Sequence, residues 1–244
     1  MPALARLRVL STYSVPKSPD YVNEDCIALS NRLGTYVLSD GASVSFDSAS
    51  WARIICVRYA QHPLIDDAWL TGAIGEYERR YNRDSLSWMA QGAFDRGSFA
   101  SVLAVRYVVE TERAEIFALG DSIAALCDGL TVVSTFPYTR SEQFLDAPEL
   151  LSTHIVKNSF LRESGYPLSR SVSWALSELT EPRVLCMTDA LGHWFILQQE
   201  AGADPVASLL DINSRYRFAA FVHRERSAGR MRRDDTTLVV LGRG

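Results

Sequence analysis

Short acidic motifs stand at the ends of apolar segments that are far apart in this chain of 244 residues. Asp40 and Asp189 each follow an apolar run, and Asp234 with Asp235 precedes another. Burying a carboxylate beside a hydrophobic core is costly unless a positive charge neutralises it. A hard divalent cation neutralises several converging carboxylates well, because it prefers oxygen ligands. The sequence therefore predicts a fold that brings distant strand ends together around bound metal.

Length and composition predict one soluble globular domain over residues 1–244. Hydrophobic residues make up 47% of the chain and charged residues 22%, which is ordinary for such a domain. The net charge of -4 gives no basic face, so we expect no nucleic-acid partner. No apolar run approaches the length of a membrane span, so we expect no membrane partner either.

The cysteines and the N-terminal sequence predict a cytoplasmic protein. Four cysteines are widely spaced and form no Cys-x-x-Cys pair, so neither a zinc site nor a disulfide framework is indicated; they are Cys26, Cys56, Cys127 and Cys186. Reduced, buried thiols are typical of an intracellular protein. Arg6 and Arg8 interrupt the first apolar stretch, which excludes a signal-peptide core.

Five arginines near the C-terminus leave two interpretations open. They are Arg224, Arg226, Arg230, Arg232 and Arg233. The simpler interpretation is a solvated helix end and loop. The alternative is that they attract a phosphorylated or acidic ligand toward the adjacent Asp234.

Apolar periodicity predicts an α+β layered domain. Strands are expected at 7–12, 26–29, 36–39, 98–109, 114–119, 123–127 and 131–134, in a segment ending at 188, and at 236–241. Helices are expected at 48–59, 66–89, 191–199 and 213–227. The consecutive strands between residues 98 and 134 have tight connections, which predicts an antiparallel meander. The stretch at about 135–170, with its scattered prolines, is expected to be an irregular excursion.

Common catalytic motifs are absent, whereas acidic motifs recur. The sequence contains no phosphate-binding G-x-x-x-x-G-K-[ST] loop, no G-x-G-x-x-G and no G-x-S-x-G elbow. Aspartate is depleted in strands, so five acidic motifs at predicted strand ends are unusual. Each motif alone also has a structural interpretation, as a turn or as the N-cap of a helix.

Taken in order, the motifs resemble those of the PPM-type (type 2C) metal-dependent serine/threonine protein phosphatases. The resemblance extends from about residue 20 to residue 241 and is carried by Asn23-Glu24-Asp25, Asp40-Gly41, Gly97-Ser98-Phe99-Ala100, Gly120-Asp121-Ser122, Thr188-Asp189 and Asp234-Asp235-Thr236-Thr237. It implies a four-layer αββα sandwich, in which two stacked antiparallel β-sheets are flanked by helix pairs. It also implies that 135–170 is a variable flap beside the active site.

The resemblance implies a centre that holds two Mn²⁺ or Mg²⁺ ions and a weaker third. Asp40 would bridge two ions, and the Gly41 carbonyl would bind one of them. Asp189 and Asp234 would complete one side, and Asp25 would serve the other ion directly or through water. A ligand of the weaker third ion would be Asp121, while Asp235 occupies a non-ligand position.

The implied reaction is hydrolysis of phosphoserine or phosphothreonine by a water that bridges the two ions. The catalytic residues would be Asp40, Asp189 and Asp234. The implied partner is a phosphorylated protein substrate, regulated by a kinase, in a signalling role.

Four departures from the family pattern keep other functions open. Ser43-Val44 replaces a Gly-Gly pair, Asp20 lies near the place of a phosphate-binding arginine with Lys17 as the nearest upstream cation, His193 replaces an acid, and Ala190 replaces a glycine. His193 is either a surface helix residue or a substituted ligand or proton donor. One alternative is a catalytically weak, phosphatase-like binding or regulatory module. The other is a hydrolase that acts on a small phosphorylated metabolite.

Overall fold

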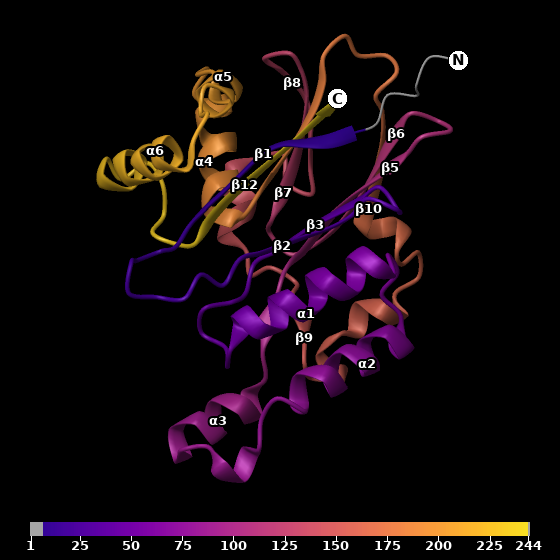
Figure 1. The fold of residues 1–244 in the computed structure, drawn as a ribbon, viewed down its shortest axis with the longest axis vertical. Coiled ribbons are helices and arrows are strands. Elements are labelled where there is room, and N and C mark those ends of the chain that lie inside the picture. The colour runs from indigo at the N-terminus through magenta and orange to yellow at the C-terminus, as the bar shows by residue number, and fades with distance from the viewer. Residues whose placement is uncertain (1–6, 244) are drawn as a thin grey trace.

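Two five-stranded antiparallel sheets, stacked face to face, form the centre of the computed structural model, which describes residues 7–243 (Figure 1). The first sheet has the strand order β1 (Leu7–Val15), β12 (Thr236–Arg243), β11 (Pro182–Met187), β7 (Ile123–Asp128) and β8 (Thr131–Phe136). The second has the order β10 (Ser171–Ala175), β6 (Arg113–Leu119), β5 (Val102–Val108), β3 (Thr35–Ser39) and β2 (Cys26–Ser30).

Alternation of side chains along the strands builds a separate core on each side of a sheet. In β12, Val239 and Leu241 join the core between the two sheets, where they meet Leu38 and Leu103 of the second sheet. The intervening Leu238 packs instead into the core beneath the helices on the outer face. Each sheet is thus buried on both faces.

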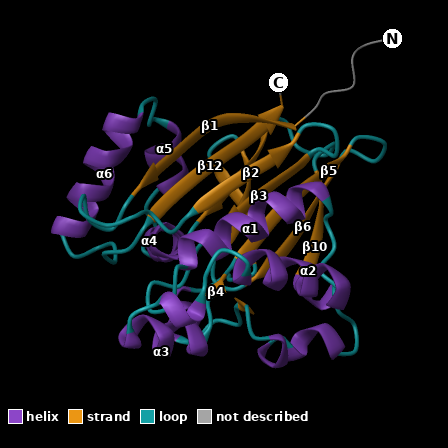
Figure 2. Ribbon diagram, turned by 60° about the horizontal axis from the view of Figure 1, so that its bottom comes forward, coloured by secondary structure: helices purple, strands orange, loops and turns teal. Residues whose placement is uncertain are grey.

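Helices cover both outer faces, which confirms the predicted four-layer sandwich (Figure 2). The second sheet is covered by α1 (Ser48–Gln61) and α2 (Asp67–Glu78), which share its outer core. The first sheet is covered by α4 (Asp189–Glu200), α5 (Pro205–Leu210) and α6 (Arg215–Ser227). Of these helices, α5 was not expected from the sequence.

The long helix expected at 66–89 is wrong in its second half. The helix α2 ends at Glu78, and after a short 3₁₀ turn at Arg83–Ser85 the separate helix α3 (Trp88–Arg96) begins. The Ser87 hydroxyl accepts a hydrogen bond from the backbone N–H of Ala90 at 3.3 Å, which caps the new helix. Trp88 is 85% exposed, so no buried apolar stripe joins the two helices into one.

The expected four-stranded meander is also wrong. β5 pairs with β6 in the second sheet, whereas β7 pairs with β8 in the first. The chain crosses between the sheets around Gly120, whose φ of +104° is a conformation that residues with a Cβ rarely adopt. A tight connection allows either a hairpin or this crossing, and the crossing places Asp121 where the two sheets meet.

The expected strand at 98–109 is interrupted. It consists of β4 (Phe99–Ala100) and β5, and between them the Ser101 N–H donates to the Asp40 carbonyl at 2.8 Å. β4 pairs with β9 (Leu151–Ser152), which lies in the excursion at 135–170. Elsewhere that excursion contains short 3₁₀ turns, at Ser141–Leu145, Ile155–Lys157, Ser159–Arg162 and Leu168–Arg170.

Within residues 7–243, no helix has the length and apolar character needed to cross a bilayer.

Trp51 fixes α1 to the second sheet and to the excursion. Its side chain is fully buried, and its Nε1 donates a hydrogen bond to the Leu151 carbonyl at 2.8 Å. We expect Trp51→Ala to lower the free energy of unfolding by about 3–5 kcal/mol, through lost burial and the cavity left behind. Chemical denaturation measures this change. Val57→Ala on the same helix, at a side chain that is 44% exposed, is the control and should change stability by less than about 0.5 kcal/mol. Equal effects of the two substitutions would contradict the assignment.

Candidate functional site

Five aspartates from distant parts of the sequence gather where the two sheets meet. They are Asp25 before β2, Asp40 after β3, Asp121 between β6 and β7, Asp189 at the start of α4, and Asp234 before β12. The other four carboxylates all act on Asp40, because their negative charge adds to burial in raising its pKa well above the ordinary value. The structure thus brings together all the aspartates that the sequence predicted, and we call them the carboxylate centre.

The backbone around Asp40 is held by the neighbouring strand and by α1. The Asp40 N–H donates to the Ser101 hydroxyl at 3.1 Å. A Cβ at Gly41 would lie 2.8 Å from the backbone and side chain of Ser48, at the start of α1. Only glycine therefore lets the helix approach this turn so closely.

Asp25 has one bound and one unpartnered carboxylate oxygen. Its Oδ2 accepts hydrogen bonds from the hydroxyls of Thr237 at 2.6 Å and Thr188 at 3.3 Å. Its Oδ1 is buried and has no hydrogen-bond partner. Burial raises the pKa of Asp25 well above its ordinary value, and the charges of Asp235 and Asp189 add to this effect.

Asp189 is buried at the N-terminus of α4, and both of its oxygens have partners. Its Oδ1 accepts from the Ala190 N–H at 2.5 Å, and its Oδ2 accepts from Arg232 Nη2 at 2.9 Å. Burial and the charges of Asp121 and Asp234 raise the pKa of Asp189 to about 7, although the Arg232 guanidinium opposes this shift.

Burial likewise raises the pKa of Asp121, again against the effect of Arg232. The centre therefore carries negative charge that the protein only partly neutralises.

Asp234 and Asp235 are adjacent but have different environments. The Asp235 side chain is 1% exposed, and it accepts hydrogen bonds from the backbone N–H groups of Lys17 and Glu24, each at 2.6 Å. It therefore fastens the two N-terminal segments to the start of β12. The carboxylate of Asp234 accepts from the Asp235 N–H at 2.9 Å and lies within the carboxylate centre.

The residues of the centre fit a hard divalent cation by their chemistry. They offer carboxylate oxygens, one of which is the buried and unpartnered Oδ1 of Asp25. Their raised pKa values show that the ionised form lacks compensation by positive charge. In the described part of the chain, however, no three His, Cys, Asp or Glu side chains already converge closely enough to form a ready metal site.

Sequence reasoning missed one basic residue of the centre and misjudged none of its aspartates' positions. Arg232 stood out only as one member of an arginine cluster, yet its guanidinium contacts Asp189. Lys17, the nearest upstream cation, donates instead to Glu24 Oε2 at 2.6 Å and to the Ser43 hydroxyl at 2.7 Å. His193 is half-buried with its ring centroid 5.2 Å from that of Phe144, and burial and Arg232 lower its pKa.

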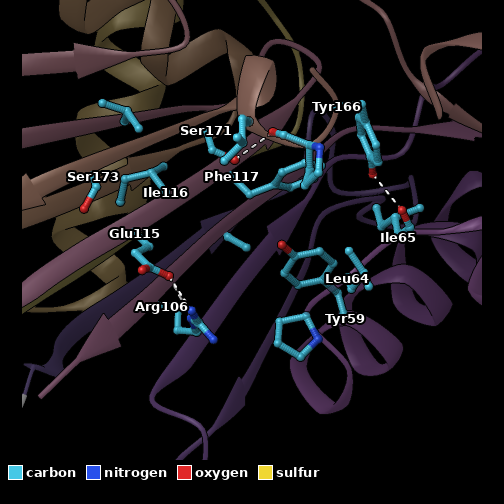
Figure 3. A pocket seen from close by; sticks show the side chains of 15 residues that line it. Tyr59, Leu64, Ile65, Arg106, Glu115, Ile116, Phe117, Tyr166, Ser171 and Ser173 are labelled. Carbon is cyan, nitrogen blue, oxygen red and sulfur yellow. Dashed lines mark hydrogen bonds and ion pairs between the residues drawn. The ribbon is translucent and has the colours of Figure 1, made fainter. Parts of the chain in front are cut away.

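A cavity of about 410 Å³ lies on another face, between the second sheet, the end of α1 and residues 166–173 (Figure 3). Tyr59 and Phe117 stack within it, with ring centroids 5.5 Å apart. At its edge Arg106 Nη2 and Glu115 Oε2 form an ion pair at 2.6 Å. The cavity contains no residue of the carboxylate centre and no group suited to activating water, so we assign the candidate chemistry to the carboxylate centre.

The raised pKa of Asp40 predicts how the stability of the metal-free protein depends on pH. The native state keeps a proton that the unfolded chain releases above about pH 4, so native stability falls as pH rises. Asp189 continues this loss up to about pH 7. Asp40→Asn removes one repelling charge, and it should therefore raise Tm at about pH 8 by at least about 2 °C, with a smaller gain near about pH 4.5.

Thermal unfolding in a chelator at both pH values measures this effect. Asp84→Asn is the control with the same charge change, at a side chain that is 92% exposed, and it should leave Tm unchanged. A Tm for Asp40→Asn at or below that of the wild type at the higher pH would contradict the prediction.

Comparisons with known proteins support the fold at low sequence identity. No protein-family model matches the sequence, and a search of the curated proteins finds no significant match. Among solved structures, PppA, a key regulatory component of the type VI secretion system (T6SS) in Pseudomonas aeruginosa, is 18% identical with a TM-score of 0.55, and the match covers 99% of each chain. A bacterial serine phosphatase is 11% identical with a TM-score of 0.61, covering 96% of this chain and 98% of that one.

The catalytic domain of the serine/threonine phosphatase PstP, in complex with two manganese ions, is 16% identical with a TM-score of 0.56, covering 98% of this chain and 99% of that one. The strand order, the flanking helices and these matches together show that the chain has the fold of the PPM-type serine/threonine phosphatases.

Proposed function

We propose that this protein is a metal-dependent phosphatase that hydrolyses phosphoserine and phosphothreonine in protein substrates. The observation that carries the proposal is the carboxylate centre, in which buried aspartates raise one another's pKa at the meeting point of the two sheets. The fold shared with serine/threonine phosphatases supports the same reaction, as does the manganese bound to PstP. We propose a cytoplasmic location, in keeping with the four free cysteines.

The proposed ligands of two Mn²⁺ or Mg²⁺ ions come from five positions. Asp40 would contact both ions, the Gly41 carbonyl and Asp25 would serve one side, and Asp189 and Asp234 would serve the other. Asp121 would hold a weaker third ion. When bound, such ions supply a nucleophilic water at neutral pH and screen the charge of the phosphoryl oxygens.

The protein's own groups hold the proposed ligands in place. The hydroxyls of Thr237 and Thr188 bind Oδ2 of Asp25, which leaves Oδ1 available to a cation. The Ala190 N–H fixes Oδ1 of Asp189. Proposed roles in catalysis thus fall to Asp40, Asp189 and Asp234, with their neighbours fixing orientation.

We expect Asp40→Asn to abolish hydrolysis while the protein stays folded. Phosphate release from a phosphoserine peptide in saturating Mn²⁺ should fall by at least about 10³-fold, because the residue proposed to contact both ions loses its charge. Asp84→Asn, with the same charge change at an exposed position, should keep wild-type activity. Wild-type turnover by Asp40→Asn would refute the assignment.

A second candidate function is a catalytically weak binding or regulatory module with this fold. It is favoured by the Arg232–Asp189 ion pair and by His193 at the position of an expected acid. PppA, which shares the fold, is a regulatory component of a secretion system. A protein that binds Mn²⁺ and a phosphopeptide in calorimetry, yet releases no phosphate, would favour this candidate over the first.

Assays that compare a phosphopeptide with small phosphate esters distinguish a protein substrate from a small metabolite. Faster turnover of the esters at equal concentration would favour the metabolite.

A further inference from the structure

The loop between α6 and β12, residues 228–235, is anchored independently of Arg232. Arg230 forms two hydrogen bonds with the buried Glu225, at 2.7 and 3.0 Å, and the Met231 side chain is 5% exposed in the core beneath the helices. At the other end, Asp235 accepts the backbone N–H groups of Lys17 and Glu24. The contact of Arg232 with Asp189 is therefore not needed to hold the loop.

The structure separates the five clustered arginines by their partners. Arg224 and Arg230 pair with Glu225. Arg226 donates to the Pro16 carbonyl at 3.1 Å and to the Thr236 hydroxyl at 2.8 Å, and Arg233 donates to the Lys17 carbonyl at 3.2 Å. Of these five, Arg232 is the one whose side chain contacts a carboxylate of the centre.

Arg232 also joins the centre to solvent. Its side chain is 45% exposed, whereas that of Asp189 is 12% exposed, and the two meet at 2.9 Å. Its charge acts on Asp121 and His193 as well as on Asp189. A planar guanidinium with paired donors matches the geometry of a phosphoryl group.

We propose that Arg232 binds the phosphoryl oxygens of the substrate in this site. The proposal rests on the proposed function and deepens it by naming a substrate-positioning residue. A divalent cation at Asp189 neutralises the carboxylate that Arg232 now neutralises. The guanidinium is then released from that oxygen while the anchored loop keeps it beside the centre.

The test is calorimetric titration of the full chain with inorganic phosphate, with and without saturating Mn²⁺. Arg232→Ala should weaken phosphate binding in Mn²⁺ by about tenfold or more, because a charge-assisted hydrogen bond is lost. Arg232→Lys should recover part of the affinity, since it keeps the charge but loses the fork. Arg233→Ala is the matched control, with the same charge change one residue away, and should alter affinity by less than about twofold. In turnover of a phosphopeptide, KM should rise for Arg232→Ala more than kcat falls.

Mn²⁺ titration separates this proposal from the proposed function. Arg232→Ala should bind Mn²⁺ at least as tightly as the wild type, because a competitor for Asp189 is removed. Weaker Mn²⁺ binding would assign Arg232 to the structure of the site and overturn the proposal. Wild-type phosphate affinity in Arg232→Ala, an equal loss in Arg233→Ala, or no phosphate binding by the wild type would overturn it too. If the wild type binds phosphate but hydrolyses nothing, the proposed function fails, and a loss specific to Arg232→Ala still supports the arginine's role.

Discussion

Mutual repulsion among buried carboxylates is the constraint on which the rest of this structure depends. Asp40 lies within the influence of four other aspartates, and its raised pKa reflects both that crowding and the loss of solvent. A fold does not place such groups together for stability, because uncompensated buried charge costs free energy. Their arrangement is best understood as a site whose charge is completed by a ligand.

The stacked sheets provide the rigidity that such a site needs. Each aspartate of the centre stands at the edge of a strand or helix that is packed on both sides, so its backbone is fixed by the core. Polar neighbours then fix the side chains, as the Thr237 hydroxyl does for Asp25. Asp235 shows the complementary role, since its backbone hydrogen bonds join the chain's N-terminal segments to β12.

Basic groups near the centre distinguish this chain's site in detail. Lys17 is occupied by Glu24, whereas Arg232 reaches the buried Asp189 from a loop that other contacts already anchor. His193 lies near enough for the same arginine to lower its pKa. The positive charge at this site therefore comes from the C-terminal loop, and local sequence patterns do not indicate which arginine supplies it.

The sequence alone determined the α+β class, most strand positions and the aspartates of the centre, because apolar periodicity and acidic residues at strand ends are local signals. The resemblance of the ordered motifs then indicated the four-layer sandwich. Only the tertiary structure decided that the chain crosses between sheets at Gly120, since a tight turn looks the same in sequence whichever sheet follows. It likewise decided the break after α2 and the Arg232–Asp189 contact. A helix stops where no core remains to bury its apolar face, and an ion pair across 43 residues depends on how distant elements pack.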